Sequence, residues 1–226
     1  MMKRYIFPLL LGVVGCAILI SLGIWQVQRL GWKEAMLAEI SAKIEGQPQA
    51  LPPEGTDTKP LKYEPVTVSG RTTGQEILVL SGQKGVGAGY RVIDAFETDQ
   101  GRKILLDRGF IPEGEKGADR PATDLTVTGN LHWPEEADSY TPKPDAKSGI
   151  WFARDVPAMA AKLGTEPILI VARTVQGAAQ GITPVPVTIT GIPNDHLGYA
   201  ITWFLLAIVW AGMTIFLLWR IRRQQA

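Results

Sequence analysis

The sequence changes from polar to apolar within one short stretch, Ile192-Pro193-Asn194-Asp195-His196-Leu197-Gly198-Tyr199-Ala200-Ile201-Thr202-Trp203-Phe204. The apolar run that starts there covers residues 197–219 and contains no charged residue. At about 1.5 Å of rise per residue its helix would be about 34 Å long, enough to cross a hydrocarbon core of about 30 Å with some tilt. We therefore predict a membrane-spanning helix, with Asn194 or Asp195 capping its first free N–H groups.

A second charge-free apolar run covers residues 5–27. It ends in Trp25-Gln26-Val27-Gln28-Arg29 rather than in a small-residue cleavage site, which favours a retained anchor over a signal peptide. Basic residues gather in the two tails, residues 1–4 and 220–226, as Lys3, Arg4, Arg220, Arg222 and Arg223. The positive-inside rule therefore predicts that both termini are cytoplasmic. Apolar residues at helical spacing over residues 28–44 predict that the first helix continues beyond the membrane.

Residues 28–196, between the two spans, are predicted to form one periplasmic β-rich domain. The chain has 226 residues and a formal net charge of +1, and its charge balance gives no basic stripe, so nucleic acid binding has no support. Its single cysteine, Cys16, lies in the first span. That excludes a disulfide within the chain and a metal site built from several cysteines.

The central domain alternates short apolar runs with turn residues, which is typical of strands. The predicted strands are residues 65–69, 76–80, 90–97, 103–110, 125–133, 167–175 and 185–190. A capping Asp155, Pro157 in the first turn and a terminal Gly164 predict one short helix. The predicted fold class is an α+β membrane protein in which two transmembrane helices flank a mostly antiparallel sheet or barrel.

Catalytic motifs are missing from this domain: it has no phosphate loop, no nucleophile elbow and no His-Glu-x-x-His. Asp107 beside Arg108, and Arg154 beside Asp155, could serve acid–base chemistry, but a stabilising ion pair or a helix cap is the commoner role. The glycines within residues 81–89 favour a hairpin loop over a phosphate cradle. His132 stands at a strand end without a second histidine nearby, so we predict a structural role.

Polar and aromatic residues gather at the outer boundary of the two spans. His196, Tyr199 and Trp203 share one face of the second helix, and Trp25 and Arg29 share one face of the first. One interpretation is an aromatic belt with a snorkelling arginine and a wetted histidine. The other is an aromatic slot for a porphyrin, in which the imidazole is an axial ligand and the arginine faces the propionates. Small residues would allow the two helices to approach closely, namely Gly12 with Cys16 and Ala207 with Ala211.

Several patterns together, in their order along nearly the whole chain, resemble the surfeit-locus protein 1 family. They are Leu22-Gly23-Ile24-Trp25-Gln26-Val27-Gln28-Arg29 with Trp32-Lys33, Tyr63-Glu64-Pro65-Val66 with Gly70, Gly89-Tyr90 with Phe96, Leu106-Asp107-Arg108-Gly109-Phe110-Ile111-Pro112, Trp151 with Asp155, and Pro193-Asn194-Asp195-His196-Leu197-Gly198-Tyr199-Ala200 with Trp203-Phe204. Phe110 departs from the tryptophan that the family often has there.

The resemblance implies an assembly factor, not an enzyme, for an aa3-type cytochrome c oxidase. It implies binding of haem a, promotion of its insertion into the catalytic subunit, and His196 as the haem-iron ligand, which Trp25, Arg29, Tyr199 and Trp203 would frame. The expected partners are cytochrome c oxidase subunit I and membrane lipid, with haem a synthase as a further candidate. Short loops and the absence of a presequence before Lys3 favour a bacterial inner membrane. The alternative is an interaction-only chaperone that stabilises an unfinished oxidase subunit without cofactor.

Overall fold

The computed structural model describes residues 3–145 and 147–224, which divide into two compact units. The helix unit contains helix α1 (Lys3–Ile44) as far as Glu39 and the chain from Ile189 onward, with helix α3 (His196–Arg223). The barrel unit covers residues 40–188. Its elements are β1 (Gln49–Ala50), η1 (Lys59–Leu61), β2 (Pro65–Gln83), β3 (Gly87–Thr98), β4 (Lys103–Pro112), η2 (Glu113–Glu115), β5 (Asp124–Leu131), β6 (Ile150–Trp151), α2 (Val156–Leu163) and β7 (Leu169–Gly177).

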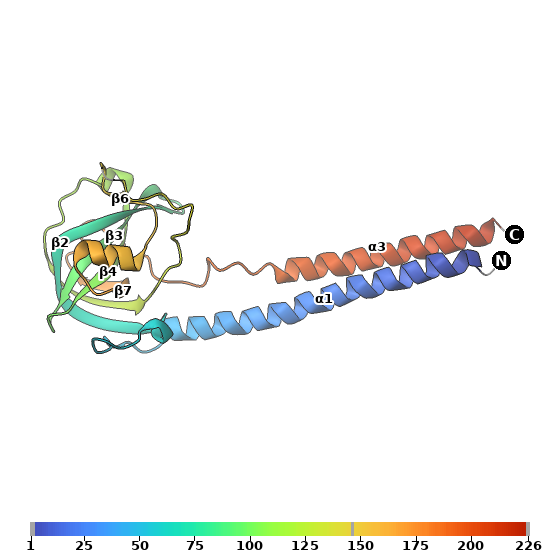
Figure 1. Cartoon of the computed structure of the whole chain (residues 1–226), viewed down its shortest axis with the longest axis horizontal. Helices are drawn as coiled ribbons and strands as arrows, with labels where there is room; N and C mark the ends of the chain where they lie inside the picture. Colours follow the sequence, from blue (N-terminus) through green and yellow to red (C-terminus); the bar gives the residue numbers. More distant parts are fainter. Residues whose placement is uncertain (1–2, 146, 225–226) are drawn as a thin grey trace. The chain divides into compact units, whose positions relative to one another are not determined.

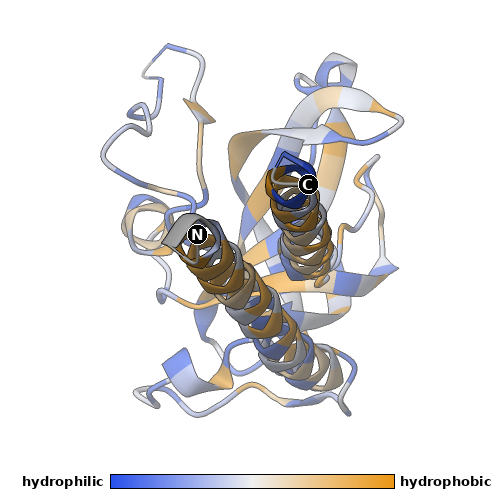
Figure 2. Cartoon of the chain, turned by 90° about the vertical axis from the view of Figure 1, so that its right-hand side faces the viewer, coloured by the Kyte–Doolittle hydropathy of each residue, from blue (hydrophilic) through white to orange (hydrophobic). Residues whose placement is uncertain are grey.

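Both long helices are long enough and apolar enough to cross a membrane. Figure 2, coloured by residue hydropathy, shows mostly hydrophobic residues along both helices. The two helices run antiparallel, so that the start of α1 and the end of α3 lie at the same end of the pair (Figure 1). The continuation of α1 to Ile44 agrees with the extension predicted from the apolar spacing of residues 28–44.

The start of α3 differs from its prediction. Asp195 occupies the N-cap position, but its side chain accepts no capping hydrogen bond within the described chain. The Asn194 Oδ1 atom is buried and likewise has no partner among the residues described. The predicted capping by one of these two side chains is therefore wrong, because the Asp195 backbone leaves its carboxylate without a bond to the first turn.

The barrel unit is built on a closed ring of strands. Strands β2, β3, β4, β7 and β5 pair in that order, and β5 pairs back with β2. The pairs are antiparallel apart from β4 with β7, while the short β1 and β6 add to β2 in parallel. Helix α2 lies against the barrel beside β4 and β2 (Figure 1). The predicted class, a mostly antiparallel sheet or barrel with a short helix between two long apolar helices, is confirmed.

Three of the predicted strands differ from the structure by more than a shift of their ends. The segments 65–69 and 76–80 are parts of one strand, β2, because a bulge between Thr72 and Glu76 carries the pairing with β3 across the polar stretch between them. Residues 185–190 form no strand, so that prediction is wrong. Pro184 and Pro186 lack backbone N–H groups in this segment, which hinders a strand ladder.

The short helix α2 follows its sequence signals closely. The Asp155 Oδ1 atom accepts a hydrogen bond from the Ala158 N–H at 3.1 Å, and the helix ends at Gly164 in the left-handed conformation with φ 66°. Met159 of α2 is fully buried against core residues that include Ile93 and Leu105. The helix thus closes one part of the barrel core.

Candidate functional site on the helix pair

A seam of small residues brings α1 and α3 into contact. On α1 the seam contains Gly12, Gly15 and Gly23, which share one face of the helix. A Cβ atom at Gly23 would lie 2.7 Å from the Phe204 ring, and Cβ atoms at the other two would clash with Thr214 and Trp210. The Cys16 Sγ atom contacts the Ala207 carbonyl oxygen at 3.8 Å, and the Trp210 indole donates to the Leu11 carbonyl at 3.4 Å. The helices therefore pack at close range along this face.

One polar contact continues this seam at the start of α3. The His196 Nδ1 atom lies 2.8 Å from the Gln26 Oε1 atom. Gln26 is only 8% exposed, and it follows Gly23 by three residues, on the same face of α1. Gln26 is not among the site residues predicted from the sequence. Its position on the glycine face was the signal that could have found it, because a polar side chain on the contact face of an apolar helix needs a partner.

The other four predicted site residues differ in burial and in the direction of their side chains. Trp203 is half-buried and follows His196 by two turns on the same side of α3. Tyr199 and Trp25 are 58% and 53% exposed on the outer surface of the helix pair. The Arg29 guanidinium lies over the Trp32 ring, 4.2 Å from its centroid. The structure thus joins His196 to Gln26, keeps Trp203 on that side, and directs Trp25 and Tyr199 outward.

The donor set fits a cofactor that takes an imidazole ligand. A neutral imidazole has one donor and one acceptor nitrogen, and the contact with Gln26 occupies Nδ1 alone. The Nε2 atom takes no part in that contact. Within the described residues no cluster of three or more His, Cys, Asp and Glu side chains exists that could hold a metal ion by itself. A metal at His196 would therefore have to bring most of its own ligands, as a porphyrin does.

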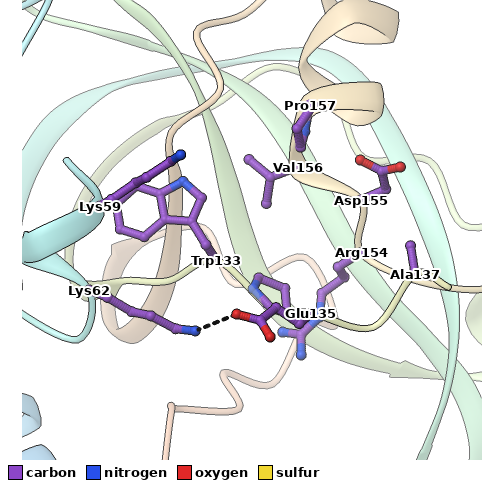
Figure 3. Close-up of a pocket in the computed structure, with 10 residues that line it drawn as sticks. Lys59, Lys62, Trp133, Glu135, Ala137, Arg154, Asp155, Val156 and Pro157 are labelled. Carbon is purple, nitrogen blue, oxygen red and sulfur yellow. Dashed lines mark ion pairs between the residues drawn. The ribbon is translucent and has the colours of Figure 1, made fainter. Parts of the chain in front are cut away.

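The barrel unit has a separate pocket of about 630 Å³. Figure 3 shows it between the Trp133 ring, the start of α2 and two lysines, Lys59 and Lys62. The Lys62 ammonium pairs with the Glu135 carboxylate at 3.8 Å, and the Trp133 indole donates to the Pro167 carbonyl at 3.3 Å. The pocket therefore combines an aromatic wall with a mixture of charges.

A chain of ion pairs lies beside this pocket. The fully buried Asp107 carboxylate accepts from Arg91 Nη2 at 2.7 Å and from Arg154 Nη1 at 3.1 Å, and Arg154 also binds Glu136. Burial alone would raise the pKa of Glu136, but its hydrogen bonds and ion pair with Arg154 hold that pKa below its usual value. These carboxylates are structural counterions to arginines, in agreement with the stabilising ion pair predicted as the commoner role for Asp107.

Other charged groups of the barrel are also structural. Arg108 pairs with Asp94 at 3.2 Å. Burial raises the pKa of Asp94 to about 6, although the neighbouring Arg108 opposes that rise. His132 packs against Tyr63 with ring centroids 5.5 Å apart, and burial together with the charges of Arg154 and Lys62 lowers its pKa to about 4. A neutral, packed His132 agrees with the structural role predicted for it.

This architecture defines a class of protein: a small β-barrel domain inserted between two apolar helices that pack as an antiparallel pair and carry a histidine at their contact. Residues 13–208, which include parts of both long helices and the whole barrel, match the SURF1 family, and the chain belongs to that family.

Curated relatives agree with this assignment. The chain is 32% identical over 209 residues to Surfeit locus protein 1 of Xenopus tropicalis, covering 81% of this chain and 67% of that protein. It is 31% identical over 217 residues to Surfeit locus protein 1 of Homo sapiens, covering 83% and 69%. It is 30% identical over 214 residues to the SURF1-like protein of Monosiga brevicollis, covering 87% and 82%.

Proposed function

We propose that this protein is an assembly factor for an aa3-type cytochrome c oxidase, and that it binds haem a at the helix pair and promotes its insertion into the catalytic subunit. The observation that carries the proposal is the contact between His196 and Gln26, because it fixes Nδ1 and leaves Nε2 for an axial bond to iron. Membership of the SURF1 family supports the oxidase as the target.

The surroundings of His196 suit a flat, partly apolar cofactor. In this proposal His196 binds the iron, Trp203 and the outward rings of Trp25 and Tyr199 contact the macrocycle, and Arg29 faces the propionates. Haem a supplies an iron that accepts a nitrogen ligand and a hydrophobic tail that partitions into lipid. The buried Asn194 Oδ1 atom, which lacks a partner among the described residues, offers a hydrogen-bond acceptor close by in sequence.

The same proposal includes the location of the protein in a membrane and the identity of its partners. The two helices would span a bacterial inner membrane with both termini cytoplasmic and the barrel periplasmic, in line with the basic tails. The barrel would then dock on cytochrome c oxidase subunit I, the subunit that receives the haem, with haem a synthase as a second partner. Since Asp107 and Asp94 pair with arginines and Asp155 caps α2, the role of these three carboxylates in this proposal is stability and not turnover.

A second candidate function is an interaction-only chaperone that holds an unfinished oxidase subunit and binds no cofactor. The barrel pocket favours it, because an aromatic wall beside Lys59 and Lys62 suits a loop of another protein. In that case His196 and Gln26 would form only a helix–helix contact.

One experiment separates the two functions. Full-length protein is purified in detergent from cells that make haem a, and oxidised and dithionite-reduced absorption spectra are recorded beside His196→Ala. The matched control is Asp195→Ala, since that neighbouring side chain makes no capping bond in the described chain. We expect a Soret band and a reduced haem a band in the parent and the control, and loss of both in His196→Ala.

Two outcomes contradict the haem proposal. Unchanged spectra in His196→Ala with stoichiometric haem would remove His196 as the ligand. A colourless parent that still co-purifies with subunit I would instead favour the interaction-only chaperone.

A further inference from the structure

We propose that Gln26 is a positioning residue for His196: its amide oxygen holds the imidazole in the tautomer and orientation that present Nε2 to a metal centre. The bond that carries this proposal joins Gln26 Oε1 to His196 Nδ1 at 2.8 Å. The metal is the haem iron of the proposed function, so the identity of the ligand rests on that function, whereas the bond itself does not.

The burial of Gln26 makes this bond hard to replace. Gln26 is 8% exposed and lies on the glycine face of α1, the face that contacts α3. A buried amide that loses its partner costs about 1–3 kcal/mol of free energy. The side chain is therefore held in place by packing and by its bond to His196 together.

The chemistry of the pair decides which ring nitrogen is free. A carbonyl oxygen can only accept, so the Nδ1 atom that faces it must carry the proton and donate. The neutral ring then has its lone pair on Nε2. Histidines that bind metals commonly donate their other N–H group to an acceptor, which fixes the ring and raises the basicity of the coordinating nitrogen.

The position of the pair adds a constraint on the ring plane. His196 is the first residue of α3, and Gln26 lies three residues beyond Gly23, the closest seam glycine on α1. Both ends of the hydrogen bond are therefore attached to helices that pack against each other along the seam. Rotation of the imidazole about its side-chain torsions would break the bond, so the ring plane is set by the helix pair and not by the loop that precedes α3.

A glutamine at this position differs from a carboxylate in one useful way. The amide oxygen accepts the Nδ1–H bond without adding a charge to an apolar region. A glutamate would accept more strongly and would push electron density toward the iron. Replacing Gln26 by Glu therefore provides a variant that retains the bond but changes the electronic property of the ligand.

The test uses the full-length chain in detergent with and without haem a. Histidine labelled with ¹⁵N gives two imidazoles in this chain, one from His132 and one from His196, so the tautomer of each is read directly. The variants are Gln26→Leu, which removes the acceptor, and Gln26→Glu, which keeps it. The matched control is Gln28→Leu, because Gln28 is exposed two residues further along the same helix.

We expect the parent, without haem, to show His196 with the proton on Nδ1. Gln26→Leu should show a mixture of tautomers and bind haem a about 10–100-fold more weakly. Gln26→Glu should restore the tautomer and shift the haem reduction potential to a more negative value than the parent's. Gln28→Leu should match the parent in all three measurements.

The measurements distinguish a failure of the positioning role of Gln26 from a failure of the proposed function. If the parent binds haem a and Gln26→Leu keeps both the tautomer and the affinity of the parent, the positioning role is wrong. If the parent binds no haem a, the proposed function fails and the role toward iron fails with it, while the tautomer spectrum still decides whether Gln26 orients the ring. If Gln26→Leu unfolds the helix pair, the tautomer and reduction potential of Gln26→Glu decide the question.

Discussion

The two histidines of the chain lie in different units and are held in different ways. His132 in the barrel has a buried Nδ1 atom without a partner in the described part of the chain, and burial and nearby cations lower its pKa to about 4. His196 on the helix pair has Nδ1 bonded to the neutral amide of Gln26, at 2.8 Å from its Oε1 atom. The barrel keeps an imidazole uncharged by desolvation and repulsion, whereas the helix pair orients one by a hydrogen bond.

The same contrast holds for the other buried polar groups. The barrel buries full charges, such as Asp107 and Arg91, and compensates them by ion pairs. The seam of the helix unit contains small residues and one amide–imidazole pair. In the proposed function the barrel provides stability and the helix pair holds the ligand, and the following predictions test that division.

The largest effect is expected for Asp107→Asn in the barrel. The change leaves Arg91 and Arg154 without their shared buried counterion, so the free energy of unfolding should fall by about 3–5 kcal/mol. Urea unfolding of the full chain in detergent, followed by near-UV circular dichroism, measures it. Asp124→Asn is the control, since its pair with Arg71 is exposed and should change stability by less than about 1 kcal/mol. Equal losses in the two variants would mean that the buried charges are not compensated as described.

The next effect concerns the helix seam. Gly23→Leu forces atoms into the Phe204 ring and should destabilise the helix pair by about 1–3 kcal/mol, with a disturbed His196 tautomer as a second readout. Gly31→Leu adds the same side chain to α1 where no described atom lies within 4 Å of the new Cβ, so it should leave the pair intact and favour the helix. Thermal unfolding followed by helical circular dichroism compares them, and a stable Gly23→Leu would argue against close packing.

The third prediction concerns the pH dependence of stability that results from the lowered pKa of His132. Its pKa is about 4 in the folded state, whereas a free histidine has a pKa of 6.5, so the unfolded chain binds more protons between these values. The parent therefore loses stability as the pH falls through that window, by about 1–2 kcal/mol once partial exposure is allowed for. His132→Phe keeps a ring beside Tyr63 and lacks this pH-dependent loss.

The quantity to measure is the difference in free energy of unfolding between the parent and His132→Phe. Asp94, with a pKa raised to about 6, has the opposite effect, because the folded chain binds its proton more tightly and stability from this group is lost as the pH rises. Both proteins contain Asp94, so its contribution cancels. His132→Phe should gain about 1–2 kcal/mol relative to the parent between pH 7 and pH 4 in urea unfolding. A constant difference would show that His132 titrates as it does in the unfolded chain.

The elements that the sequence predicted well have local causes. The two long helices follow from charge-free apolar runs, and α2 follows from Asp155, Pro157 and Gly164 within a few residues of one another. The undivided strand β2 has a cause that is not local. Its polar stretch around Thr72 resembles a loop in sequence, and only pairing with β3 and β5 keeps it in the sheet.

The candidate site was predictable only in part for the same reason. His196 stands out because few polar residues lie beside an apolar run. Its partner Gln26 is 170 positions away, and the register of α1 against α3 decides that they meet. Asp107 likewise binds Arg91 and Arg154, which are 16 and 47 positions away. An ion pair could therefore be predicted as one role of Asp107, but its partners could not.

The smallest effect is expected at Asn194, two residues before His196. Its Oδ1 atom is buried without a partner in the described residues, so Asn194→Ala removes no hydrogen bond made by that oxygen and relieves a desolvated group. Thermal stability of the helix pair should change by no more than about 0.5 kcal/mol, and the His196 tautomer should stay as in the parent. Gln26→Ala, measured in parallel, should lose about 1–3 kcal/mol because it leaves the Nδ1–H group of His196 unpaired. A loss at Asn194 as large as that at Gln26 would mean that the Asn194 oxygen is bonded in the working protein, and the orientation of His196 would then depend on the segment before α3 as well as on the seam.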